Sequence, residues 1–196
     1  MTQKKYELLK NDTITAPNGK TLYRIKSLIN FGVVVAGSLG GYIEKEDNLA
    51  HSGNAWVYGN AQVYGNAQVS DNAQVYGDAR VYGNAQVYGN ALVSDNARVY
   101  GNARVYGDAL VSDNARVCSK KDLVWFSNVG TEQGTLTVYK SKDDSLLATR
   151  GCFNGTVDEF LAKSAKVHDE RIKREYRLLI EVAKSRLLGE SYVPTF

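Results

Sequence analysis

The chain has 196 residues, 43% of them hydrophobic and 23% charged, and a formal net charge of +3. These values are typical of a soluble globular protein, and the charge is too weak to indicate nucleic-acid binding by itself. No apolar run approaches the roughly 20 residues that a bilayer-spanning helix needs, and the first residues lack the apolar core of a secretory signal. The two cysteines do not make a disulfide framework. We therefore expect a cytoplasmic protein with no membrane partner and no specific DNA or RNA binding.

Residues 1–54 are expected to form a strand-rich cap and a lead-in coil. The stretch 21–25 alternates between apolar and polar residues, as a strand with one buried face does. An apolar run at 31–36 and a glycine-rich turn at 37–41 follow it. Such a segment is suited to covering the end of the repeat array that comes next.

A six-residue repeat occupies residues 55–118. Valine recurs at every sixth position from Val57 to Val117, and alanine stands two residues before each valine. This period excludes an α-helix, in which apolar residues return every three or four positions. Alanine and valine point to one side of a short strand, and the Gly-Asn or Asp-Asn pair that follows makes a turn. A strand and a corner every six residues must coil, so the segment predicts a β-helix.

The repeat resembles the hexapeptide-repeat family, except that glycine or aspartate stands two residues after the valine, where that family often has glycine one residue after it. The resemblance implies a mainly β fold, a left-handed parallel β-helix with three units per coil, and a homotrimer. The preceding segments 40–44 and 48–57 are similar to the lead-in of hexapeptide-repeat proteins from tailed bacteriophages and prophages. That similarity implies a location in the cytoplasm of an infected or lysogenic host and a role against host defence.

Three units per coil place residues 18 apart in register, about 4.8 Å from one another. The interior then consists of valine and alanine columns and has no room for a ligand. Function is therefore expected on the outer faces, at the ends or in the flanking segments. The three outer faces carry different side chains, and only two of them suggest a role.

One of these, which we call the Arg–Tyr face, carries an arginine column beside a tyrosine column. Its candidate ligand-binding residues are Arg80, Arg98, Arg116, Tyr64, Tyr82 and Tyr100. Stacked guanidinium groups repel one another unless an anion neutralises them. Arginine beside tyrosine also suits phosphate and an aromatic base. The alternative is a solvated ladder in which the arginine stems lie across the tyrosine rings.

The second face with a suggested role, the Trp–Leu face, carries Trp56, Leu92 and Leu110 in one column. Exposed apolar stripes usually mark an interface, so a contact between subunits of a trimer is one interpretation. Packing by the C-terminal segment of the same chain is the other. The remaining face, which we call the third face, carries less charge and has no predicted role.

Residues 119–196 are expected to form a small α+β domain. Its predicted elements are a strand at 123–126, a hairpin of 134–139 with 145–150, a helix opened by a capping box at 156–159 and ending near His168, and a helix at about 169–188. The apolar residues 192–196 follow, and they either hold a contact or fray. The domain is small for an independent core, so it is expected to dock on the β-helix or on a neighbouring subunit.

The sequence argues against an enzyme. Acyltransferases of this family need a base, usually a histidine on a loop extruded from the β-helix, but the repeat has no inserted loop. The only histidines are His51, which precedes the repeat, and His168, at a predicted helix end. A zinc site of three histidines is excluded for the same reason, and no phosphate-binding loop motif or nucleophile elbow occurs. We therefore expect no catalytic residue, metal or cofactor.

The leading hypothesis is a non-enzymatic oligomeric phage-type protein that sequesters a small anionic nucleotide signal on the Arg–Tyr face. The first alternative is an inhibitor or spacer that binds a host defence protein through residues 119–196. The second alternative is an acyltransferase that uses His51.

Overall fold

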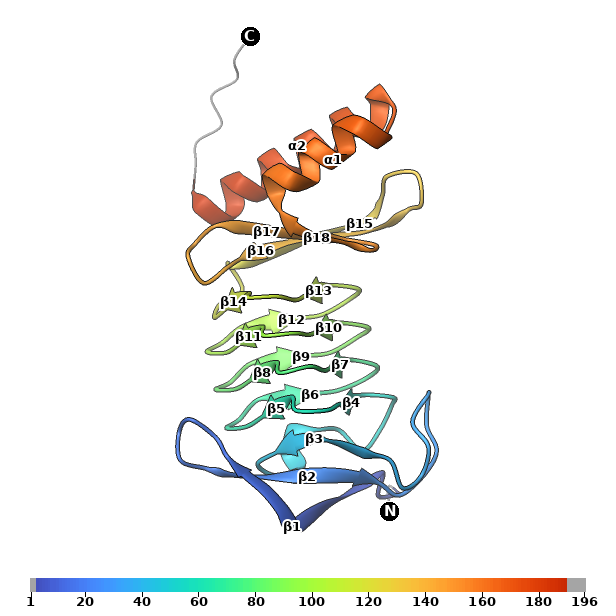
Figure 1. Ribbon diagram of the computed structural model, residues 1–196, viewed down its shortest axis with the longest axis vertical. Helices are drawn as coiled ribbons and strands as arrows, with labels where there is room; N and C mark the ends of the chain where they lie inside the picture. Colours follow the sequence, from blue (N-terminus) through green and yellow to red (C-terminus); the bar gives the residue numbers. More distant parts are fainter. Residues whose placement is uncertain (1–2, 190–196) are drawn as a thin grey trace.

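The computed structural model describes residues 3–189, which form an elongated molecule (Figure 1). An N-terminal sheet closes one end of a β-solenoid, and a C-terminal domain of a sheet and two helices closes the other (Figure 1). Neither of the described helices is long and apolar enough to cross a membrane.

The solenoid is built from strands of two residues each that stack in three parallel columns. The strands are β4 (Trp56–Val57), β5 (Gln62–Val63), β6 (Gln68–Val69), β7 (Gln74–Val75), β8 (Arg80–Val81), β9 (Gln86–Val87), β10 (Leu92–Val93), β11 (Arg98–Val99), β12 (Arg104–Val105), β13 (Leu110–Val111) and β14 (Arg116–Val117). One column is β4-β7-β10-β13, one is β5-β8-β11-β14 and one is β6-β9-β12. Residues 18 apart pair in parallel register, as the repeat predicts. The solenoid therefore completes about four turns, and each turn contributes one strand to each column.

The interior confirms the predicted alanine and valine columns. Each alanine and valine of the repeat from Ala55 to Val117 is at most 1% exposed. Glycine fills most corners because the backbone there is left-handed, with a φ of +68° at Gly77. Asp71, Asp95 and Asp113 occupy the same position in the units that lack tyrosine, with φ between +55° and +59°. Aspartate tolerates this conformation better than most residues, so these units keep the corner without glycine.

Side-chain amides run along the corners as hydrogen-bonded ladders. The amide of Asn54 donates to Asn72 at 3.0 Å, Asn72 to Asn90 at 3.1 Å, and Asn90 to Asp108 at 3.0 Å. Asn72 and Asn90 each donate and accept, whereas the carboxylate of Asp108 only accepts. Aspartate therefore stands where this ladder needs no further donor.

The N-terminal segment extends one column of the solenoid. The segment contains β1 (Tyr6–Thr15), β2 (Thr21–Ser27) and β3 (Leu39–Ile43). Strand β2 is antiparallel to both β1 and β3, and β3 lies parallel to β5. The Arg–Tyr column thus belongs to a seven-stranded sheet. The apolar run 31–36 forms a turn, in which Val33 is 83% exposed.

The open end of the first coil is closed by buried side chains. Lys5 is 1% exposed, and its ammonium donates to the carbonyl oxygens of Gly53 at 3.4 Å and Ala55 at 2.9 Å. The Tyr6 hydroxyl donates to the carbonyl oxygen of Leu49 at 2.7 Å. A 3-10 turn, η1 (Glu46–Asn48), lies beside them.

The C-terminal domain has its own core. An antiparallel sheet of β15 (Leu123–Val129), β16 (Gly134–Lys140), β17 (Leu146–Arg150) and β18 (Phe153–Thr156) packs against α1 (Val157–Val167) and α2 (Glu170–Leu188). The predicted capping box is present, with the Thr156 hydroxyl accepting from the backbone N–H of Glu159 and the Glu159 carboxylate accepting from Thr156. The predicted strands, hairpin and helices are confirmed, and β18 was not predicted. The predicted tail, residues 192–196, lies outside the described residues.

The sheet of this domain lies across the last coil. The hydroxyl of Thr137 accepts from the Leu110 backbone N–H at 3.1 Å, and that of Thr149 donates to the Leu110 carbonyl oxygen at 2.8 Å. The Tyr139 hydroxyl lies 3.3 Å from the backbone nitrogen of Ser112. Side chains of the sheet therefore satisfy the backbone groups of Leu110 and Ser112 that the last coil leaves free.

Candidate binding grooves

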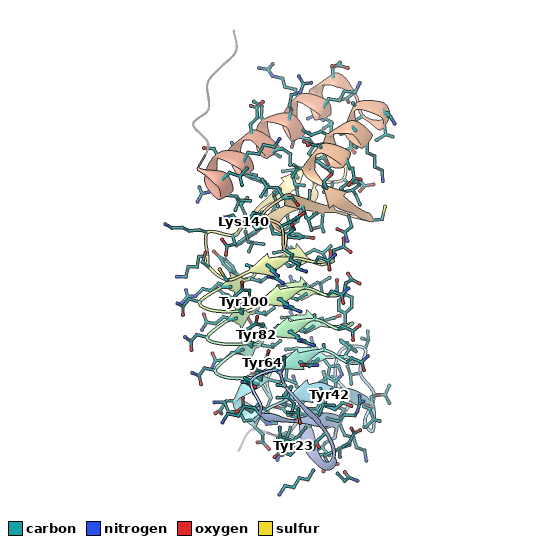
Figure 2. The ribbon with its side chains drawn as sticks, turned by 60° about the vertical axis from the view of Figure 1, so that its left-hand side comes forward. Tyr23, Tyr42, Tyr64, Tyr82, Tyr100 and Lys140 are labelled. Atoms are coloured by element: carbon teal, nitrogen blue, oxygen red, sulfur yellow. The ribbon has the colours of Figure 1, made fainter. Side chains whose placement is uncertain are left out.

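The Arg–Tyr face brings its six predicted residues together on one side of the solenoid. Arg80, Arg98 and Arg116 pair in register on β8, β11 and β14. The tyrosines follow one residue after each valine, and Figure 2 shows Tyr64, Tyr82 and Tyr100 one above the other. The two columns lie side by side because both flank the inward valine of each strand.

A turn of the N-terminal sheet walls this face into a groove. Pro17 and Asn18, between β1 and β2, line a hollow of about 450 Å³ together with Tyr64, Arg80, Tyr82 and Arg98. The turn projects to this side because β1 and β2 extend the same sheet. Sequence reasoning did not predict this wall, since nothing in the repeat indicates where the β1–β2 turn lies.

The electrostatics of the groove are one-sided. No carboxylate of the described residues pairs with Arg80, Arg98 or Arg116, although Arg24 on the same sheet is paired with Asp12 at 2.7 Å. Burial raises the pKa of Tyr64, whereas the charges of Arg80 and Arg98 lower it. The positive charges of Arg80 and Arg98 therefore reach Tyr64. No carboxylate in the described part of the chain lines the groove, so its net charge is positive.

The tyrosine rings do not offer the free flat surfaces that the sequence suggested. Tyr82 stacks on Tyr64 and on Tyr100, in both cases with ring centroids 5.1 Å apart and interplanar angles of 3° and 7°. Each face of the Tyr82 ring is thus covered by a neighbour, and Tyr64 is only 4% exposed. A base cannot be sandwiched within the column, so the ring edges, the hydroxyl groups and the guanidinium groups remain for binding.

The tyrosine column ends at Cys118. The Cys118 thiol donates to the Asp122 carboxylate at 3.0 Å, and this contact, followed by burial, raises the pKa of the thiol. The same carboxylate accepts from the backbone N–H groups of Cys118 and Ser119, each at 2.9 Å. Asp122 thereby holds the turn at residues 118–122, where the chain leaves the solenoid.

The Trp–Leu face is not an open stripe. Trp56 is 1% exposed, because Phe31 packs edge-on against it at 5.3 Å and Tyr6 at 6.1 Å. The predicted interface role of Trp56 is therefore wrong, and the cover comes from the N-terminal segment rather than the C-terminal one. Leu92 and Leu110 remain half-buried.

The two histidines have structural partners. His51 stacks on Tyr6 with centroids 4.4 Å apart and accepts from the Lys5 backbone N–H at 3.1 Å. His168 caps the end of α1 and lies 3.1 Å from the Ser164 hydroxyl. Within residues 3–189, no group of three His, Cys, Asp or Glu side chains is placed to hold a metal ion.

The C-terminal domain contains a smaller hollow that the sequence did not reveal. It measures about 230 Å³ and is lined by Arg150, Lys163 and His168 over aromatic rings. Arg150 is already engaged, since it donates to the carbonyl oxygen of Val129 at 3.0 Å and lies 3.6 Å from Glu132. Its guanidinium therefore ties β17 to the end of β15.

Comparison with known proteins supports the solenoid. Residues 73–85, 85–101 and 97–112 match the family model described as the YdcK beta solenoid repeat. The chain is thus similar to β-solenoid repeat proteins over part of its solenoid, and the match does not reach either end. No curated protein matches the chain.

Proposed function

We propose that the protein is a non-enzymatic binding protein whose Arg–Tyr groove holds a small phosphorylated ligand such as a nucleotide signal. The observation that carries this proposal is the stack of Arg80 and Arg98, which no carboxylate of residues 3–189 neutralises and which lines a hollow of about 450 Å³. Guanidinium groups in register repel one another, so an anion that bridges them gains more than it would from a single arginine.

The covered ring faces determine how a nucleotide would lie. Its phosphate groups would bridge Arg80 and Arg98, which present forked donors to anionic oxygens. Its base would then lie against the wall at Pro17 and the edge of Tyr82, where hydroxyl and apolar groups meet. In this arrangement the arginine column supplies the affinity, and the β1–β2 turn limits which ligand shapes fit the groove.

Several finer assignments accompany this proposal and rest on the resemblances of the repeat and of the segments 40–44 and 48–57. They are a left-handed helix of the hexapeptide-repeat type, assembly as a homotrimer, a phage or prophage origin, and action in the host cytoplasm against a defence signal. Size-exclusion chromatography with light scattering measures the subunit number directly. A monomer would remove the trimer from the proposal and leave the groove intact.

Isothermal titration calorimetry against mono-, di- and cyclic nucleotides and ADP-ribose tests the function. We expect at least one ligand to bind, and the Arg80→Ala/Arg98→Ala double variant to weaken it by tenfold or more. Arg171→Ala/Arg174→Ala is the matched control, because these two exposed arginines of α2 lie outside the Arg–Tyr groove. Absence of heat across the whole panel would overturn the proposal.

A protein-binding role through the C-terminal domain is the second candidate. Val167 at the end of α1 is 64% exposed and Leu178 on α2 is 50% exposed, so both apolar side chains are available to a partner. Pull-down with the Val167→Asp/Leu178→Asp variant tests it. A partner that the wild type retains and this variant loses supports the role, and equal recovery refutes it.

A further inference from the structure

A second groove lies where the third face of the solenoid meets the C-terminal domain. Two hollows of about 440 and 120 Å³ share Tyr106, Lys120, Leu123 and Trp125 in their walls. One extends down the solenoid to Arg104, and the other extends up to Arg186 on α2. Because four residues line both, the two hollows are adjacent, and we call them together the junction groove.

The junction groove is lined by cations without any acid. Arg104, Lys120, Lys121 and Arg186 line it, and no aspartate or glutamate does. None of these four cations forms an ion pair with another residue of the part of the chain that the structure describes. The solenoid supplies one of them, the linker after its last coil supplies two, and α2 supplies the last, so the positive charge is spread over both hollows.

Aromatic rings form the floor between these charges. Tyr88 stacks on Tyr106 with centroids 5.0 Å apart, and Trp125 meets Tyr106 edge-on at 4.4 Å and 84°. The tyrosine column of this face therefore ends against an indole turned almost perpendicular to it. Trp125 is half-buried, in contrast to the fully buried Trp56, and Tyr106 is 38% exposed. Unlike the Arg–Tyr column, this one ends in an accessible ring of a different orientation.

We propose that the junction groove binds single-stranded nucleic acid without sequence preference. A positive channel that follows the phosphate backbone, with aromatic side chains for the bases, is the arrangement that binds single strands in unrelated proteins. The phosphates would lie along Arg104, Lys120 and Lys121, and a base would pack on Trp125. An acidic peptide would satisfy the cations equally well, but it would leave the half-buried indole of Trp125 without a flat partner. This site is separate from the Arg–Tyr groove and does not depend on its function.

Tryptophan fluorescence reads this site selectively. The chain has two tryptophans, and Trp56 is 1% exposed. Quenching by a 12-nucleotide oligothymidylate in low salt therefore reports on Trp125. We expect saturable quenching, and we expect Lys120→Ala/Lys121→Ala to weaken the affinity by tenfold or more. Arg171→Ala/Arg174→Ala, which removes two exposed arginines of α2 that do not line the junction groove, is the matched control and is expected to leave the affinity unchanged.

The salt dependence of binding and competition by an acidic peptide distinguish the possible outcomes. Three phosphates neutralised on a single strand give a slope of log K against log salt of about −2. A 12-residue oligoglutamate that displaces the oligonucleotide at equal concentration would show that the groove selects charge alone, and would overturn the assignment. So would binding that Arg80→Ala/Arg98→Ala abolishes, or an absence of quenching. Trp125→Phe keeps an aromatic ring, so its affinity, followed by anisotropy of a labelled oligonucleotide, is expected to fall only a fewfold.

Discussion

The two ends of the solenoid are closed by opposite chemistry. At the N-terminal end, the buried ammonium of Lys5 donates to the carbonyl oxygens of the first coil. At the C-terminal end, the neutral hydroxyl groups of Thr137, Thr149 and Tyr139 satisfy the last coil. Both ends meet the same requirement, since unpaired buried backbone groups are costly. The first does so with a cation, and the second with hydroxyl groups and the carboxylate of Asp122, which accepts from the backbone N–H groups of Cys118 and Ser119.

This difference has a consequence for stability. Burial lowers the pKa of Lys5 to about 8, so the folded protein holds this proton less tightly than the unfolded chain does. Burial raises the pKa of Tyr139 to about 12, so its hydroxyl stays neutral over the ordinary pH range. The N-terminal end is therefore sensitive to mild alkali and the C-terminal end is not. The stability of the coils between them depends on close packing and not on an ionisable group.

The coils give the largest expected effect. A Cβ added at Gly77 would lie 2.9 Å from the backbone nitrogen of Asp95, whereas at Gly59 its nearest neighbour would be 3.9 Å away. Both glycines have a positive φ, so alanine at either position would be strained in the left-handed conformation. Only Gly77→Ala adds a clash with the backbone of the next coil. We expect Gly77→Ala to lower the free energy of unfolding by about 2–4 kcal/mol and Gly59→Ala by about 1 kcal/mol. If urea denaturation gave the same loss in the free energy of unfolding for both variants, the next coil would have moved away from the added Cβ at no cost.

The C-terminal end comes next. Thr149 is 1% exposed, and valine has nearly its shape, so Thr149→Val removes only the hydrogen bond to the Leu110 carbonyl oxygen. We expect a loss of about 2 kcal/mol in the free energy of unfolding, since a buried carbonyl is left unpaired. This loss should not change between pH 7 and pH 9.

Thr135→Val on the neighbouring strand is the control. Its hydroxyl has only an exposed contact with Ser127, at 3.4 Å. We expect a change within about 0.5 kcal/mol. A cost for Thr149→Val as small as this would mean that water replaces the lost hydrogen bond at the C-terminal end.

The sequence predicted those parts of the fold that repeat or carry local signals. A valine at every sixth position is enough to fix the coil, the register and the inward columns. The capping box at Thr156 likewise predicts where α1 begins, because its partners are three residues apart. Both are short-range patterns, which a sequence displays directly.

The ends and the groove walls depend on contacts between distant residues. Lys5 meets Ala55, and Phe31 covers Trp56, through packing that no local pattern records. A lysine near a terminus is ordinarily solvated, so its burial could not be predicted. The junction groove was missed for the same reason, since Arg104 and Arg186 come to line adjacent hollows only when the C-terminal domain docks.

The smallest effect tests the charged end. The unfolded chain holds the Lys5 proton up to a pKa of 10.5 and the folded protein only to about 8, so stability rises with pH between these values. From pH 8 to pH 9.5 the gain is roughly 1.5 kcal/mol in the free energy of unfolding. Near pH 10 the free energy of unfolding stops rising. Burial raises the pKa of Tyr6 in the folded protein, so this tyrosine ionises first in the unfolded chain.

Lys5→Met separates this gain from other alkaline effects. Methionine retains an apolar stem but carries no proton, so urea denaturation of this variant is expected to show no gain in the free energy of unfolding between pH 8 and pH 9.5. Thr149→Val, which leaves Lys5 in place, should keep the rise. If the wild type does not gain stability over this interval, Lys5 is solvated when it is charged, and the two ends differ in structure but not in their response to pH.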